Sequence, residues 1–125
     1  LKNITVTKNY MDGICDIAVD QERMKIAFLN IIVNAIEAME PGAGILQLKT
    51  FSRDDKCIIS ITDNGPGIDE ESLSKVFEPY FTNKTRGTGL GLTNTQNIVL
   101  NHNGHIGLES RKGIGTTFTI QLDFA

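Results

Sequence analysis

The sequence predicts a two-layer α/β sandwich, in which a mixed, mostly antiparallel sheet carries helices on one face. Short alternating or apolar runs, which are typical of strands, occur near both ends and in the middle of the chain. Two longer segments repeat apolar residues at helical spacing. The chain has 125 residues, enough for one domain that buries roughly two-thirds of its unfolded surface without disulfides or metals.

The first third of the chain predicts two strands followed by a long helix. Residues 3–7 (NITVT) alternate between polar and apolar side chains, and residues 13–19 (GICDIAV) do so for most of their length. Both are predicted as strands, joined by a short turn near residues 10–12. A single amphipathic helix is predicted over residues 20–39, capped by Asp20 and stopped by Pro41 and Gly42. Its apolar face would consist of Met24, Phe28, Ile31, Ile32, Ala35 and Met39.

The middle of the chain predicts a β-hairpin and then a turn. Two apolar runs, residues 45–51 and 57–62, flank the polar residues 52–56. The following residues 63–67 (DNGPG) fit the interior of neither a strand nor a helix. A short helix is predicted over residues 70–76.

The last third predicts a loop, a second helix and two final strands. The loop covers residues 78–87, and the helix covers residues 90–100 and ends near Asn103 and Gly104. The strands are predicted over residues 105–110 and 116–123.

Composition and charge exclude several classes of protein. The net charge of −3 argues against non-specific nucleic-acid binding, which needs a basic face. No apolar run approaches the roughly 18–20 residues that a membrane span requires, so we expect no direct membrane insertion by this domain. Cys15 and Cys57 lack metal-ligand spacing and predict reduced core residues in a cytoplasmic domain. Because the chain begins with Leu1, we expect it to be a piece of a longer protein.

Glycine is concentrated in two short clusters. Five of the twelve glycines fall between Gly65 and Gly91, in the segments DNGPG and GTGLG. The second cluster leads into a predicted helix, whose free N–H groups would form an anion site. The alternative is a flexible turn and a helix start without a ligand. The full dinucleotide spacing and the lysine-bearing Walker pattern are both absent from the sequence.

Two asparagines share one face of the first predicted helix. Asn30 and Asn34 are spaced i, i+4 among apolar residues. An asparagine carbonyl oxygen suits Mg²⁺, a hard cation that keeps several waters and binds phosphate oxygens. The alternative is a pair of polar groups at the helix edge that hydrogen-bond to their neighbours.

Five segments, in their order along the chain, resemble the motifs of the histidine-kinase catalytic domain. They are residues 28–39 (FLNIIVNAIEAM, N box), 63–68 (DNGPGI, G1 box), 77–84 (FEPYFTNK, F box), 87–92 (GTGLGL, G2 box) and 115–118 (GTTF). The family's wider superfamily includes gyrase, the Hsp90 chaperones and the MutL repair proteins. The resemblance covers almost the whole chain. It implies one catalytic domain over residues 1–125 with the Bergerat fold, an α/β sandwich with a mobile ATP lid.

The resemblance also implies how ATP is bound at its base. Asp63 would accept a hydrogen bond from the adenine amino group, and Thr117 would support this contact, directly or through water. Gly65 and Gly67 would let the backbone pass close to the base. The implied cofactor-binding set also includes Ala38, Ile68 and Phe77.

At the phosphate end, the resemblance implies a magnesium site and a basic lid. Asn34 would ligate Mg²⁺, with Asn30 as a second polar contact. Lys84 and Arg86 would neutralise phosphate charge, with solvated lid charges as the alternative. Asn30, Asn34 and Lys84 form the implied catalytic set. Gly87, Gly89 and Gly91 would wrap the phosphates with backbone N–H groups. Thr88, Leu90 and Leu92 also belong to the implied cofactor-binding set.

The lid would span residues from about 69 to 86. Its aromatic residues Phe77, Tyr80 and Phe81 are expected to pack into the core when ATP is bound and to face a partner helix bundle otherwise.

One position favours a kinase over a hydrolase. ATP-hydrolysing relatives commonly carry a glutamate one turn before the magnesium asparagine, and this chain has Asn30 there. An amide cannot act as a general base, so we predict slow intrinsic ATP hydrolysis. Where some family members carry a basic residue after Asn34, this chain has Glu37 and Ala38, and the role of Glu37 stays open.

The resulting hypothesis is a two-component signalling kinase. The domain would bind ATP and Mg²⁺ and donate the γ-phosphate to a histidine on a separate upstream dimerisation domain, in a parent homodimer that signals to a response regulator. The parent could be membrane-anchored. His102 and His105 match no acceptor motif, so we expect structural or surface roles and no self-labelling. The alternatives are a serine kinase of the anti-sigma-factor type and a nucleotide-binding module without transfer activity.

Overall fold

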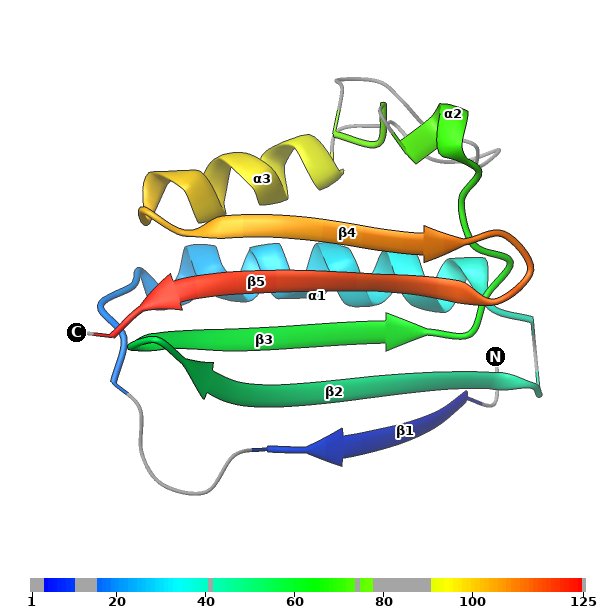
Figure 1. The fold of residues 1–125 in the computed structure, drawn as a ribbon, viewed down its shortest axis with the longest axis horizontal. Helices are drawn as coiled ribbons and strands as arrows, with labels where there is room; N and C mark the ends of the chain where they lie inside the picture. Colours follow the sequence, from blue (N-terminus) through cyan, green and yellow to red (C-terminus); the bar gives the residue numbers. More distant parts are fainter. Residues whose placement is uncertain (1–3, 11–15, 41, 74, 78–90, 125) are drawn as a thin grey trace.

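A computed structural model describes residues 4–10, 16–40, 42–73, 75–77 and 91–124. Its centre is one sheet of five strands in the order β1-β2-β3-β5-β4 (Figure 1). The strands are β1 (Ile4–Asn9), β2 (Gly44–Arg53), β3 (Lys56–Asp63), β4 (His105–Arg111) and β5 (Gly115–Asp123). Strand β1 runs parallel to β2, and the other neighbouring pairs are antiparallel. The predicted mixed, mostly antiparallel sheet is therefore confirmed.

The helices lie on one face of this sheet, as the sequence predicted (Figure 1). They are α1 (Gln21–Ala38), α2 (Glu70–Leu73) and α3 (Gly91–Asn101). The predicted cap is confirmed, because the side chain of Asp20 accepts a hydrogen bond from the backbone N–H of Arg23 at 3.1 Å. The core between helices and sheet contains Met24, Ala27, Ile31, Ala35, Met39, Leu46, Ile61, Ile98, Val99, Phe118, Ile120 and Leu122.

The prediction of a strand over residues 13–19 is wrong for residues 16–19, the part that the structure describes. Residues 16–20 have no regular structure, although Ile17 and Val19 are half-buried against the core. The physical reason is topological, since β1 and β2 are parallel and the chain must cross the sheet between them through α1. The alternation of residues 16–20 reflects packing against the core and does not reflect pairing in the sheet.

The remaining predicted elements occur close to their expected positions. The hairpin forms, with β2 and β3 each longer than predicted and joined by a two-residue turn in which Asp54 and Asp55 have positive φ angles of 52° and 60°. The short helix ends earlier than predicted, at Leu73, and residues 75–77 form turns. In the described ranges, no helix is both long and apolar enough to cross a bilayer.

One histidine joins the ends of the two long helices. The ring of His102 bonds through Nδ1 to the carbonyl oxygen of Ile98 at 2.7 Å, and its Nε2 accepts the backbone N–H of Asp20 at 3.0 Å. This arrangement requires a neutral ring with its proton on Nδ1. The predicted structural role of His102 is confirmed, and His105 is exposed at the start of β4.

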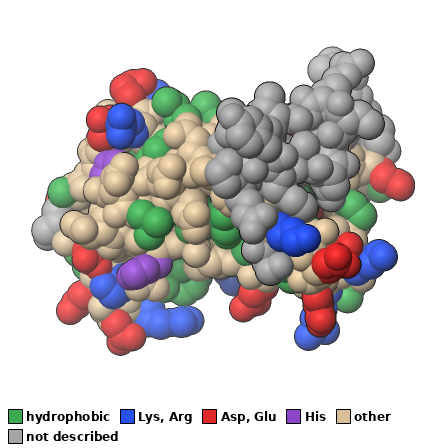
Figure 2. All heavy atoms as spheres, turned by 90° about the horizontal axis from the view of Figure 1, so that it is seen from above, with side chains coloured by type: hydrophobic (Ala, Val, Ile, Leu, Met, Phe, Trp, Pro, Cys, Tyr) green, Lys and Arg blue, Asp and Glu red, His purple; other side chains and the backbone are tan. Residues whose placement is uncertain are grey.

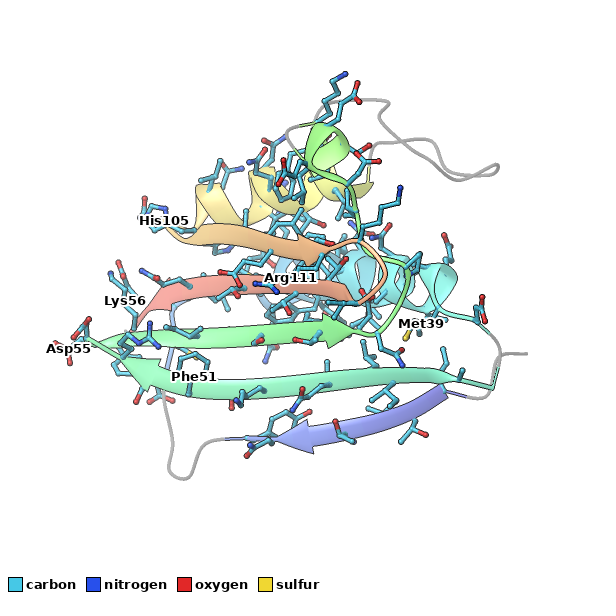
Figure 3. The ribbon with its side chains drawn as sticks, turned by 45° about the vertical axis from the view of Figure 1, so that its right-hand side comes forward. Met39, Phe51, Asp55, Lys56, His105 and Arg111 are labelled. Carbon is cyan, nitrogen blue, oxygen red and sulfur yellow. The ribbon has the colours of Figure 1, made fainter. Side chains whose placement is uncertain are left out.

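Acidic and basic side chains are interspersed on the face shown in Figure 2, among the residues that are drawn in colour. The two ends of the sheet differ, however. Figure 3 shows Asp55 and Lys56 at one end and Met39, which follows α1, at the other. The candidate site described next lies at the Met39 end.

Candidate functional site

A buried carboxylate marks the centre of the candidate site. Asp63, the last residue of β3, is only 7% exposed, and its Oδ1 accepts the backbone N–H of Gly65 at 2.8 Å. Burial raises the pKa of Asp63 above its usual value of 3.8, and hydrogen bonds from the backbone of Gly65 and Thr116 partly oppose this rise. A buried carboxylate at the end of a strand can accept hydrogen bonds from a ligand that donates them.

Asp63 lies beside the C-terminal end of α1. A Cβ atom on Gly65 would be 3.0 Å from Oδ1 of Asp63 and 3.3 Å from the carbonyl oxygen of Ala38. A side chain at position 65 would require these neighbours to move by a few tenths of an ångström, so glycine suits the narrow space between strand and helix. Asn34 is one helical turn before Ala38 on the same side of α1 and is half-buried. The predicted neighbours Asp63, Gly65 and Ala38 are thus brought together, and Asn34 lies one helical turn away along α1.

The other end of the site is the meeting point of α1 and α3. The side-chain amide of Asn30 donates a hydrogen bond to the carbonyl oxygen of Gly91, the first residue of α3, at 3.2 Å. An open hollow here is lined by Ile26, Asn30, Gly91, Thr93, Asn94 and Asn97. From Ala38 back to Asn30 is eight residues, or about 12 Å along a helix axis. An extended nucleoside triphosphate spans a comparable distance.

The loop after Asp63 is held on both sides by hydrogen bonds. The side chain of Asn64 accepts the N–H of Ile45 at 2.8 Å and donates to the carbonyl of Ala43 at 3.0 Å. On the other side, the N–H of Gly113 donates to the carbonyl of Pro66 at 2.6 Å. The loop is therefore attached both to the start of β2 and to the hairpin between β4 and β5.

Two residues predicted at the base contact this hairpin. Gly67 has a φ of +76°, and a Cβ atom there would lie 2.1 Å from the carbonyl oxygen of Arg111. The N–H of Ile68 donates to Oγ of Ser110 at 2.8 Å. The packing of the loop on the hairpin explains why position 67 requires glycine. A close approach of Gly67 and Ile68 to a base stays a prediction.

The threonine beside Asp63 is Thr116, whereas the sequence predicted that Thr117 supports the adenine contact; that role of Thr117 stays a prediction. Asp63 is paired with Thr116 across β3 and β5, so their side chains share the face that carries the helices. Thr116 is also 7% exposed. Thr117 points to the opposite face, where its hydroxyl lies 3.0 Å from that of Thr62. A direct contact of Thr117 with Asp63 is excluded by this alternation.

Two other predicted nucleotide contacts are part of the core packing. The ring of Phe77 lies edge-on to Phe118, with centroids 6.4 Å apart, and its carbonyl accepts the hydroxyl of Thr93 at 2.8 Å. Leu92 is half-buried against the core. Phe77 packs against the core in this structure, whereas the dependence of this packing on ATP and the contact of either residue with a nucleotide stay predictions.

Several predicted phosphate-binding residues, with Tyr80 and Phe81 of the lid, lie outside the described residues. These phosphate-binding residues are Lys84, Arg86, Gly87, Thr88, Gly89 and Leu90. Of the predicted phosphate-binding segment, the described part comprises Gly91 and Leu92 at the start of α3.

Sequence reasoning missed two residues, Thr116 and Ser110. The signal for Thr116 was present, because Phe118, Ile120 and Leu122 alternate as apolar residues in β5 and extend the core face back to position 116. No such signal existed for Ser110, because its hydrogen-bond partners lie five to forty-two residues away along the chain.

The family is decided by a comparison with models of known protein families. The model of the "Histidine kinase-, DNA gyrase B-, and HSP90-like ATPase" family matches residues 19–125. The chain belongs to this ATPase family. The resemblance that the five motifs indicated is therefore confirmed, and so is the fold class.

The curated relatives of this ATPase domain are kinases. Sporulation kinase C of Bacillus subtilis (strain 168) is 38% identical over 124 residues, which are 98% of this chain and 28% of that protein. The signal transduction histidine-protein kinase AtoS of Escherichia coli (strain K12) is 43% identical over 104 residues, which are 82% of this chain and 17% of that protein. The chain thus spans less than a third of the length of these relatives.

Solved structures of histidine kinases share this ATPase fold. The nucleotide-free catalytic domain of the histidine kinase ThkA has a TM-score of 0.85 and 32% identity, and the match covers 96% of this chain and 78% of that one. Full-length ShkA in complex with AMPPNP has a TM-score of 0.86 and 27% identity, and the match covers 98% of this chain and 26% of that one.

Proposed function

We propose that this chain is the ATP-binding catalytic domain of a two-component sensor histidine kinase, one part of a longer protein. It binds ATP with Mg²⁺ and donates the γ-phosphate to a histidine on a separate dimerisation domain. The observation that carries the proposal is the burial of Asp63 at the end of α1, with Asn34 one turn away on the same helix. The family membership of the chain supports the same conclusion.

Asp63 selects the base through its charge and its burial. The adenine amino group donates hydrogen bonds, which a carboxylate accepts. Guanine presents a carbonyl oxygen at the same position, and two acceptors repel each other. A buried polar group that loses its partner costs about 1–3 kcal/mol, which corresponds to roughly 10- to 100-fold in affinity.

The donor set at Asn34 fits Mg²⁺ held jointly with phosphate. In the part of the chain that the structure describes, no group of three or more His, Cys, Asp or Glu side chains could hold a metal. Magnesium is commonly bound by few protein oxygens together with waters and substrate phosphates, so one amide oxygen is a sufficient protein contribution. When bound, the ion would neutralise phosphate charge, and Asn34 would hold it beside α1.

The phosphate end is formed by the start of α3 and the lid. The N-terminus of an eleven-residue helix, such as α3, offers free N–H groups and the positive end of its dipole to an anion. Gly87, Thr88, Gly89 and Leu90 precede it directly in the sequence, and Lys84 and Arg86 add two positive charges.

Asn30 favours transfer of the phosphoryl group over its hydrolysis. Its amide donates to the carbonyl of Gly91 and has no basic group with which to activate water. In the transfer, a ring nitrogen of the acceptor histidine forms a bond to the γ-phosphorus, the bond to the bridging oxygen breaks, and ADP leaves. Positioning and charge neutralisation supply most of the rate in such reactions, so the acceptor can reside on another domain.

The partners follow from the transfer. The upstream dimerisation domain would present the acceptor histidine in a homodimer, and a response regulator would receive the phosphoryl group from it. The catalytic domain would work in the cytoplasm, with or without a membrane anchor elsewhere in the parent protein.

A titration with ATP and Mg²⁺ tests the binding step. We expect saturable binding by the unaltered chain and a roughly 10- to 100-fold weaker affinity for Asp63→Asn, because the amide replaces a charged acceptor by a neutral one. Asp123→Asn is the matched control, since it makes the same change at an exposed strand end. Equal affinities of the chain and Asp63→Asn would contradict the proposal.

A labelling experiment tests the transfer step. The chain alone should hydrolyse ATP slowly and take up no label from γ-labelled ATP. Addition of the helical domain that carries the acceptor histidine should restore labelling, and the label should be lost in acid as expected of phosphohistidine. Fast magnesium-dependent hydrolysis by the chain alone, or acid-stable label on serine, would contradict a histidine kinase.

A further inference from the structure

The outer face of α1 carries an exposed apolar stripe. Ile26, Leu29 and Val33 are between 45% and 52% exposed. Their spacing of three and four residues places them next to one another on successive turns of the helix. Between Lys25 and Glu37, α1 has no charged side chain, although the outer face of such a helix is usually charged or polar. Single exposed apolar residues are common, but a stripe of neighbours indicates a contact surface.

This stripe borders the phosphate end of the candidate site. Ile26 lies four residues before Asn30 and Val33 lies three residues after it, so both are its neighbours on the surface of the helix. Together with Asn30 and Gly91, Ile26 also lines the hollow between α1 and α3. The apolar stripe is therefore continuous with the place where the proposed function puts the γ-phosphate.

The acceptor of the phosphoryl group has to reach this place from outside the chain. A transfer requires the reacting atoms to come within about 3–3.5 Å of each other. The sequence contains two histidines, and His102 is bonded to Asp20 at the start of α1. Asn30 lies ten residues further along α1, or about 15 Å along the helix axis. His105 lies at the far end of the sheet from Met39 (Figure 3). A domain that supplies the acceptor histidine must therefore contact the surface around Asn30.

We propose that the stripe of Ile26, Leu29 and Val33 is the docking surface for the helical domain that carries the acceptor histidine. This inference rests on the proposed function and names the surface that brings the histidine to the γ-phosphate. A ridge of side chains at this spacing packs into the groove of a partner helix at an interaxial distance of about 8–10 Å. The partner helix presents apolar residues to the stripe, and its histidine points toward Asn30.

The decisive measurement is the rate at which the parent protein transfers label from γ-labelled ATP to its acceptor histidine, together with its affinity for ATP and Mg²⁺. We expect Leu29→Ser and Val33→Ser each to slow labelling roughly 10-fold, as is typical when a central interface residue is truncated. The affinity for ATP should stay unchanged, because neither side chain belongs to the nucleotide site. Leu29→Met keeps an apolar side chain of similar volume, and it should label at the rate of the unaltered protein.

Leu100→Ser is the matched control for Leu29→Ser. Leu100 is 50% exposed and lies near the end of α3, away from the stripe and from the candidate site. The same change of residue type there should leave labelling unchanged. Unchanged labelling in Leu29→Ser, or equal losses in Leu29→Ser and Leu100→Ser, would overturn the proposal.

A second copy of this chain is the competing occupant of the stripe. In that case the chain alone would dimerise in analytical ultracentrifugation, and Leu29→Ser would make it monomeric, which would also overturn the proposal. A chain that is monomeric with and without the substitution supports docking of the helical domain. Absence of labelled histidine in the unaltered parent protein would instead refute the proposed function, and the docking surface with it.

Discussion

The two ends of β3 carry charged side chains in opposite circumstances. At the first end, Lys56 donates to Asp123 of β5, and the two side chains are 37% and 58% exposed. At the last end, Asp63 is 7% exposed and accepts a backbone N–H. The same two strands therefore hold an ion pair in solvent at one end and a buried carboxylate at the other.

The difference separates an end that bears an exposed ion pair from the end where we propose a ligand site. An exposed ion pair contributes little because water and salt screen it. A buried carboxylate that accepts backbone N–H groups retains part of its desolvation cost, which the raised pKa of Asp63 reflects. The Asp63 end is therefore the end where we propose that a ligand donates a further hydrogen bond.

The largest effect on stability is expected from Gly67→Ala in the loop after Asp63. The backbone of Gly67 has a positive φ angle, which strains any residue with a side chain. A Cβ atom at this position would also lie 2.1 Å from the carbonyl oxygen of Arg111. Gly113→Ala is the matched control, since its φ of +85° is similar but its Cβ would have open space. We expect a loss of about 1–2 kcal/mol for Gly113→Ala and about 2–3 kcal/mol more for Gly67→Ala.

Urea unfolding of both glycine variants measures this difference. Equal losses of unfolding free energy would mean that the loop moves away from Arg111 without cost. That result would contradict the close packing of the loop after Asp63 on the hairpin between β4 and β5.

A smaller effect is expected in the pH dependence of stability. Because burial raises the pKa of Asp63, the folded state binds its proton more tightly than the unfolded state does. The contribution of Asp63 to stability therefore improves as the pH falls through the raised pKa toward 3.8, and it is least favourable at neutral pH. Asp63→Asn removes this dependence, so the ligand-free variant should match or exceed the unaltered chain in stability at pH 7.

The test is to measure the unfolding free energies of the unaltered chain and of Asp63→Asn at several pH values between about 4 and 7. The unaltered chain should gain relative to Asp63→Asn as the pH falls. A relative loss over the same range would show that the folded state prefers the charged carboxylate, and the contrast between the two ends would disappear.

The smallest effect is expected at the exposed end of β3. A double-mutant cycle with Lys56→Met and Asp123→Asn should give a coupling free energy of about 0–1 kcal/mol, and salt should reduce it. A coupling well above this range would make the exposed pair a major support of the sheet.

Much of the architecture could be predicted from local patterns. The helical spacing from Met24 to Met39 placed α1 and its buried face correctly, since burial of an apolar stripe repeats with the period of the helix. The polar residues between β2 and β3 placed the hairpin, because a short polar segment between two apolar runs is typical of a turn that joins two strands. Residues 16–19 were misread because alternating burial also arises where a chain packs against a core without pairing.

The sequence by itself determined the helices, the hairpin, the family motifs and the importance of Asp63, because these depend on residues that are close along the chain. Only the tertiary structure decided that Thr116, and not Thr117, lies beside Asp63, that Asn30 bonds to Gly91 sixty-one residues away, and that Ser110 joins loop and strand. The physical reason is that these contacts depend on sheet order and strand register. Both result from the packing of the whole core, which no short segment encodes.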